Sequence, residues 1–186
     1  MKYYVQIMTI IQIIFFIKIP KTTSKNVSET DASGFIDITE LIPEILLDIR
    51  YYSNFNFVGE RIPGYKEPIA LMTKEVGNAL KKVSEYLREK GYLIKIFDAY
   101  RPQKAVDYFV SWAKNNDTKM KKYFYPNISK KEIIPKEYVA TKSDHSKGST
   151  IDLTLFNMNE GKDMELLIFF WEISHPDYIT NQQKKK

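Results

Sequence analysis

The chain alternates between segments whose apolar residues recur at helical spacing and segments whose apolar residues occupy every second position. From Thr73 to Lys90 the spacing is helical, with Thr73 able to cap the first turn and Gly91 able to end the last. A second helical pattern covers residues 103–114. Its apolar positions are Ala105, Val106, Phe109, Val110 and Ala113. The spacing therefore predicts two helices that each bury one face.

Strand signals occupy three segments around these helices. Residues 45–51 alternate between apolar and polar, which predicts a strand with Tyr51 on its apolar face. Residues 92–97 and 150–155 are short apolar runs that indicate further strands. Because strand and helix signals alternate and no internal repeat is visible, the sequence predicts a single α+β domain.

Two segments lack a sustained period. Residues 52–59, followed by Pro63 and Gly64, are rich in turn-forming and aromatic residues, which indicates a surface loop. Residues 115–142 carry many lysines and two prolines, which indicates an irregular insertion.

Composition narrows the class of protein. A chain of 186 residues with 44% hydrophobic content suits one compact domain. The formal net charge is +5, but Lys2, Lys18 and the three closing lysines at 184–186 supply all of it, so the body is neutral. We therefore expect no nucleic-acid partner. The absence of cysteine excludes disulfides, thiolate metal sites and cysteine nucleophiles.

The N-terminus has the layout of an export signal. An apolar run from Tyr3 to Ile17 follows Lys2 and precedes a polar stretch. We therefore assign residues 1–20 to a signal peptide or signal anchor and residues 21–35 to a linker. The protein is then expected in the periplasm or cell envelope, with membrane contact only through this segment. The alternative is a buried N-terminal strand or helix in a cytoplasmic protein.

The candidate chemistry lies in the run from Ser143 to Thr154. His145 and Asp152 are seven residues apart, and Gly148 between them permits a turn that points both side chains at one metal ion. The alternative is a surface histidine beside a strand aspartate.

Arg101 is the second candidate. It follows a predicted strand end and precedes Pro102, which disfavours the α conformation at the arginine and could hold it at the rim of a cleft. A fixed cation beside a metal stabilises an oxyanion. The alternative is a purely structural ion pair with Asp98.

Two motifs together resemble a known family. Asp-Ala-Tyr-Arg-Pro at 98–102, followed by Ser-Asp-His-Ser-Lys-Gly-Ser-Thr-Ile-Asp-Leu-Thr-Leu at 143–155, is similar to the zinc-dependent D-alanyl-D-alanine dipeptidases, including those of vancomycin resistance. The resemblance extends over residues 36–163. It implies an α+β fold with a central, mostly antiparallel sheet and flanking helices.

The resemblance also implies a set of roles and a substrate. His145 and Asp152 match zinc ligands, with one Zn²⁺ per chain, and Arg101 matches the arginine that stabilises the transition state. Asp98 matches the residue that orients Arg101, and Ser143 matches a residue of the substrate pocket. The implied protein is a metallo-dipeptidase that hydrolyses D-Ala-D-Ala, a small D,D-dipeptide, in peptidoglycan metabolism.

The C-terminus departs from the family pattern. The family carries its general base and third zinc ligand as Glu-x-x-His beyond the aspartate, and this chain offers only Glu172 and His175, whose flanking residues fit a different family loop better. We therefore expect residues 164–186 to be divergent, by truncation or a frame shift, with the C-terminal part of the family fold missing. Three readings follow: Glu172 as base and His175 as third ligand, a non-catalytic cell-wall-binding module, or a non-functional fragment.

Overall fold

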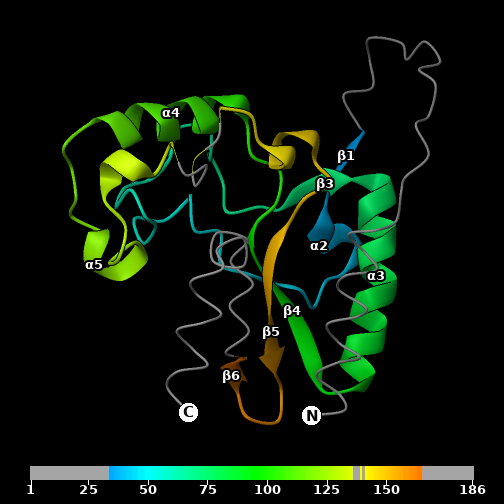
Figure 1. Ribbon diagram of the computed structural model, residues 1–186. Coiled ribbons are helices and arrows are strands. Elements are labelled where there is room, and N and C mark those ends of the chain that lie inside the picture. Colours follow the sequence, from blue (N-terminus) through cyan, green and yellow to red (C-terminus); the bar gives the residue numbers. More distant parts are fainter. Residues whose placement is uncertain (1–33, 136–138, 140, 165–186) are drawn as a thin grey trace, which may run out of the picture.

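The computed structural model describes residues 34–135, 139 and 141–164 (Figure 1). Residues 1–33, which include the predicted signal segment, lie outside the described residues. So do residues 165–186, which include Glu172, His175 and all but the first residue of the segment predicted to be divergent. The elements in chain order are β1 (Phe35–Asp37), α2 (Ile38–Leu41), β2 (Leu46–Leu47), β3 (Leu71–Thr73), α3 (Lys74–Glu89), β4 (Tyr92–Asp98), α4 (Gln103–Lys114), α5 (Lys121–Phe124), the 3₁₀ helices η1 (Lys130–Glu132) and η2 (Asp144–Lys147), β5 (Asp152–Asn157) and β6 (Lys162–Asp163).

The strands form two sheets. The larger sheet has the order β2-β4-β5-β6, in which β2 pairs with β4 in parallel and the other two pairings are antiparallel. Strands β1 and β3 form a separate antiparallel pair. Figure 1 shows α3 lying along β4, and α4 beyond the end of the strand where the chain leaves β4. The predicted α+β fold with a mostly antiparallel sheet and flanking helices is confirmed.

Both predicted helices are confirmed. In α3 the Thr73 hydroxyl accepts the N–H of Val76, and Gly91 after the helix has a φ of +85°, the left-handed conformation that favours glycine. Helix α4 has the predicted bounds, and four of its five predicted apolar positions are buried, with Val110 partly buried against the same core. None of the helices in the described part of the chain is long and apolar enough to cross a membrane.

The strand bounds differ from the prediction. Only Leu46 and Leu47 of the predicted strand 45–51 form a regular ladder. The chain beyond them still follows β4, with Asp48 N–H donating to the Ile96 carbonyl and Arg50 N–H to the Phe97 carbonyl. Strand β5 begins at Asp152 rather than at residue 150, because its ladder with β4 ends at the Asp98–Asp152 pair.

The predicted surface loop 52–59 is wrong in part, because two of its residues are buried. Val58 belongs to the core, and the buried Asn56 organises the turn. The Asn56 amide donates to the carbonyls of Arg50, Ser53 and Glu60, and its oxygen accepts two backbone N–H groups. One side chain thus satisfies the backbone locally, and such a turn needs no hydrophobic period.

The predicted irregular insertion 115–142 is more ordered than expected. It contains α5 and η1, and Tyr125 and Ile133 are buried in the main core. The Lys130 ammonium lies 3.9 Å from the centroid of the Trp112 ring and 2.6 Å from Asn115 Oδ1. These contacts fasten the segment to the C-terminal end of α4.

Candidate metal centre

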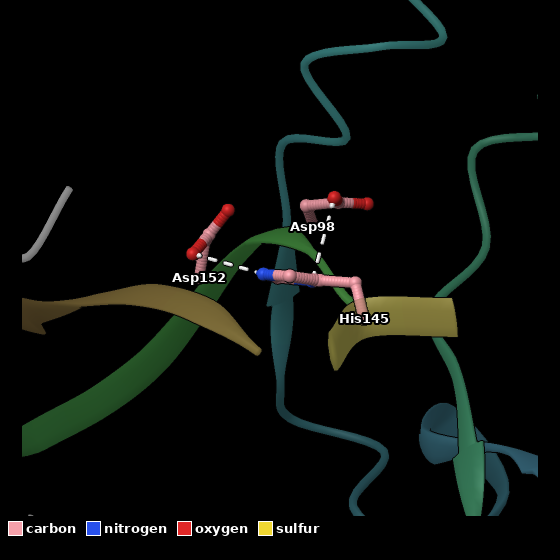
Figure 2. Close-up of side chains that lie close together, drawn as sticks. All are labelled: Asp98, His145 and Asp152. Atoms are coloured by element: carbon pink, nitrogen blue, oxygen red, sulfur yellow. Dashed lines mark ion pairs between the residues drawn. The ribbon is translucent and has the colours of Figure 1, made fainter. Parts of the chain in front are cut away.

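Three polar side chains from distant parts of the sequence meet where β4 ends and β5 begins. Asp98 is the last residue of β4, Asp152 is the first of β5, and the two are cross-strand partners. His145 is in η2, which is tied to the chain after β4 by Arg101 N–H donating to the His145 carbonyl. Figure 2 shows the three side chains pointing toward one another, and a ligand atom of each lies within 4.8 Å of the others.

Hydrogen bonding sets the state of the His145 ring. Its Nδ1 lies 2.8 Å from the Ala99 carbonyl oxygen, which can only accept, so Nδ1 carries a proton and donates. In the neutral ring the lone pair is then on Nε2, which lies 3.5 Å from Asp152 Oδ1. Among the described residues, Asp152 Oδ1 is buried without a hydrogen-bond donor. Two acceptors that face each other in this way fit a shared cation.

The electrostatics of His145 agree with this geometry. Burial lowers the pKa of the imidazole, but the nearby carboxylates of Asp152 and Asp98 outweigh burial and raise the pKa above its ordinary value. The pair of His145 and Asp152 is therefore an electronegative position that a proton or a metal ion can fill.

Asp98 belongs to the same cluster, but donors already surround its carboxylate. Oδ1 accepts from the Tyr65 hydroxyl at 2.7 Å and from Ala99 N–H at 3.0 Å. Oδ2 lies 2.7 Å from Arg101 Nη2 and 2.9 Å from Arg101 Nε. Burial raises the pKa of Asp98, and the Arg101 guanidinium opposes that rise. Of the three clustered residues, His145 and Asp152 have ligand atoms free for a metal.

Arg101 lies beside the cluster in a fixed position. Its side chain is 15% exposed, and its Nη2 lies 3.5 Å from Asp152 Oδ2. Its Cζ lies 5.1 Å from the centroid of the Tyr51 ring and 5.6 Å from that of the Phe109 ring. Burial lowers the pKa of Arg101, but Tyr51 and the Asp98 carboxylate outweigh burial, so the group stays charged. The ion pair with Asp98 forms, and it holds the cation next to Asp152.

The other candidates from the sequence have different outcomes. Ser143 is near the cluster, with its hydroxyl oxygen 3.4 Å from Arg101 Nη1. Glu172 and His175 lie outside the described residues. Tyr65 was missed, because it lies in a loop and neither a period nor a motif marks it.

An imidazole, a carboxylate with a free oxygen and a neighbouring guanidinium are the kind of groups found at mononuclear metal sites. Comparison with known proteins identifies the protein family. The model of the D-Ala-D-Ala dipeptidase family matches residues 31–175, and the chain belongs to this family.

Similar proteins carry the same family name. The chain is 39% identical over 131 residues to the D-alanyl-D-alanine dipeptidase of Enterococcus faecalis, covering 70% of this chain and 65% of that protein. It is 38% identical to the D-alanyl-D-alanine dipeptidase of Enterococcus faecium, and the match covers 69% of this chain and 64% of that protein. It is 36% identical to that of Streptomyces coelicolor, and the match again covers 69% of this chain and 64% of that protein. The match spans just under two thirds of the length of each relative.

Proposed function

We propose that this protein is a zinc-dependent dipeptidase that hydrolyses D-Ala-D-Ala. The observation that carries the proposal is the pair of facing acceptors, His145 Nε2 and Asp152 Oδ1, with the Arg101 guanidinium beside them. No donor among the residues that the structure describes reaches Asp152 Oδ1. The printed names of the relatives support the substrate, since they are D-alanyl-D-alanine dipeptidases. Imidazole and carboxylate ligands without thiolates suit zinc at a catalytic site, with one ion per chain.

Each residue of the site then has a distinct task. His145 and Asp152 would hold the zinc ion, which when bound would supply Lewis-acid chemistry, polarising a carbonyl and making water a nucleophile near neutral pH. Arg101 stabilises the negative charge that develops on the carbonyl oxygen. Asp98 orients Arg101 through two contacts to its Oδ2. Ser143 lines the substrate pocket next to Arg101 Nη1.

A catalytic zinc ion normally has three protein ligands, and the mechanism also needs a general base. The one cluster of metal-ligating side chains in the described part of the chain contains a single histidine and no glutamate. Within this sequence, His175 and Glu172 are the candidates for the third ligand and the base. The chain has only two histidines, so each can be tested by one substitution.

Zinc binding should depend strongly on His145. We expect His145→Ala to weaken zinc affinity by more than about 100-fold, because the substitution removes a metal ligand. Substitution of residues that only hydrogen-bond a metal ligand already weakens metal binding by up to about 100-fold. Competition with a chromophoric chelator measures the affinity. A comparable loss in His175→Ala would identify His175 as the third ligand. Unchanged affinity in His145→Ala would contradict the proposed site.

The activity itself is tested on the purified chain with added zinc. We expect release of D-alanine from D-Ala-D-Ala, loss of that release with a chelator, and no comparable release from L-Ala-L-Ala. Binding of D-Ala-D-Ala without hydrolysis would instead indicate a cell-wall-binding module. Absence of both under saturating zinc would indicate a non-functional fragment.

We also propose export to the periplasm or cell envelope, supported by the apolar run from Tyr3 to Ile17 after Lys2. Residues 1–35 fused to a reporter that is active only outside the cytoplasm should produce signal. A Lys substitution in the middle of the apolar run should abolish that signal.

A further inference from the structure

We propose that Tyr65 is a positioning residue for Arg101, acting through the Asp98 carboxylate. This inference rests on the proposed function, because it assigns Tyr65 a part in that site. Tyr65 precedes Asp98 by 33 residues and lies in the loop between β2 and β3. Its hydroxyl donates to Asp98 Oδ1 at 2.7 Å, and in the described part of the chain no side-chain hydrogen bond joins it to His145 or Asp152.

The two oxygens of Asp98 have separate partners, and this division fixes the plane of the carboxylate. Oδ1 takes the Tyr65 hydroxyl and the Ala99 N–H, whereas Oδ2 takes the Nε and Nη2 of Arg101 and also lies 3.5 Å from His145 Nδ1. Rotation of the carboxylate would break contacts at both oxygens. Without the hydroxyl, Oδ1 would keep only the Ala99 N–H. A buried carboxylate with fewer donors would rotate, so that the Arg101 N–H groups would be shared between its two oxygens.

The turn that carries Tyr65 packs directly against the chain at Arg101. Gly64 has a φ of +107°, and a Cβ at Gly64 would lie 2.7 Å from Pro102 Cγ, so the turn approaches Pro102 as closely as a glycine allows. Arg61 Nε donates to the Tyr65 carbonyl at 2.8 Å and braces the turn. The loop therefore contacts both sides of Arg101: the Gly64 backbone lies against Pro102, and the Tyr65 hydroxyl binds Asp98.

The aromatic ring of Tyr65 packs against Tyr51, whose ring lies beside the guanidinium. Its centroid lies 5.4 Å from that of Tyr51, whose own ring is 5.1 Å from Arg101 Cζ. Phenylalanine at position 65 would keep this ring contact and lose only the hydroxyl. Tyr65→Phe therefore separates the hydrogen bond from the packing.

The chain offers a matched control in Tyr125. This tyrosine is also buried, and its hydroxyl has no hydrogen-bond partner among the residues that the structure describes. Tyr125→Phe thus removes a buried hydroxyl that holds nothing in the site.

The test compares Tyr65→Phe and Tyr125→Phe with the parent protein loaded with zinc. We expect Tyr65→Phe to lower kcat for D-Ala-D-Ala about tenfold, while KM and zinc affinity stay within about twofold, because substrate and metal contacts are untouched. The Nε–H resonance of Arg101 in a ¹⁵N-labelled sample, assigned by its loss in Arg101→Lys, should shift and exchange faster with water. Tyr125→Phe should change none of these.

The two hypotheses can fail separately. An unaltered Arg101 Nε–H resonance in Tyr65→Phe overturns the positioning role, whether or not the chain hydrolyses the dipeptide. An unaltered kcat in an active chain overturns it as well. If the parent lacks dipeptidase activity, the proposed function fails, and the resonance still decides whether Tyr65 positions Arg101.

Discussion

Replacing Arg101 with lysine is expected to lower kcat for D-Ala-D-Ala hydrolysis by about 10²- to 10³-fold, the size of effect seen when one donor to an oxyanion is removed. Lysine keeps the positive charge, so Asp98 is not left buried beside a neutral side chain. It lacks the planar fork that lets Arg101 contact Asp98 through Nε and Nη2 while reaching toward Asp152 and Ser143. Steady-state kinetics with saturating zinc measure the loss, and zinc affinity should change little.

Arg50 provides the matched control for this substitution. It is 20% exposed, pairs with Asp48 at 3.1 Å and lies 4.5 Å from the Phe97 ring, so its surroundings resemble those of Arg101 without the metal-ligating pair. Arg50→Lys should leave kcat within about twofold of the parent. If Arg101→Lys retained parental kcat, the assignment of Arg101 as the stabilising cation would be wrong.

Gly148→Ala should be strongly destabilising and should disturb His145. Gly148 ends η2 with a φ of +72°, and a Cβ there would lie 2.2 Å from Phe35 Cε1. The substitution therefore combines a left-handed backbone with a steric clash, for which we expect a loss of about 3 kcal/mol in the free energy of unfolding. Urea denaturation measures the loss.

Gly161 provides a control that separates the cost of the steric clash at Gly148 from the cost of its left-handed backbone conformation. This glycine also has a positive φ, of +64°, but no atom of the described residues lies within 4 Å of a Cβ placed there. Gly161→Ala should therefore cost about 1 kcal/mol, the backbone penalty alone. A Gly148→Ala protein as stable as Gly161→Ala would show that Phe35 moves aside freely. In that case zinc affinity should stay at its parental value.

The two aspartates of the site are chemically alike but have different partners. Asp98 is enclosed by Tyr65, Ala99 and Arg101, so both of its oxygens are taken. Asp152 has one buried oxygen with no donor among the described residues. The surroundings of each carboxylate, rather than its residue type, therefore separate a positioning group from a candidate metal ligand.

The sequence by itself determined the two main helices. The bounds of α4 match the prediction, and Thr73 and Gly91 mark the ends of α3 as expected. Helix period, capping and termination act within a few residues, so they can be read locally. The family resemblance, carried by 98–102 and 143–155, also selected the residues that the fold brings together, although their roles stay predictions.

Only the tertiary structure decided which side chains of the site have free atoms. The cross-strand pairing of Asp98 with Asp152, the proton on His145 Nδ1 and the contact from Tyr65 all depend on residues far apart in the chain. Local patterns contain no record of such contacts, because strand register and loop packing are set by the whole core. For that reason residues 52–59, with Pro63 and Gly64, were predicted as a surface loop, and no pattern marked the next residue, Tyr65. The fold buries Tyr65 and places its hydroxyl on the carboxylate that holds Arg101.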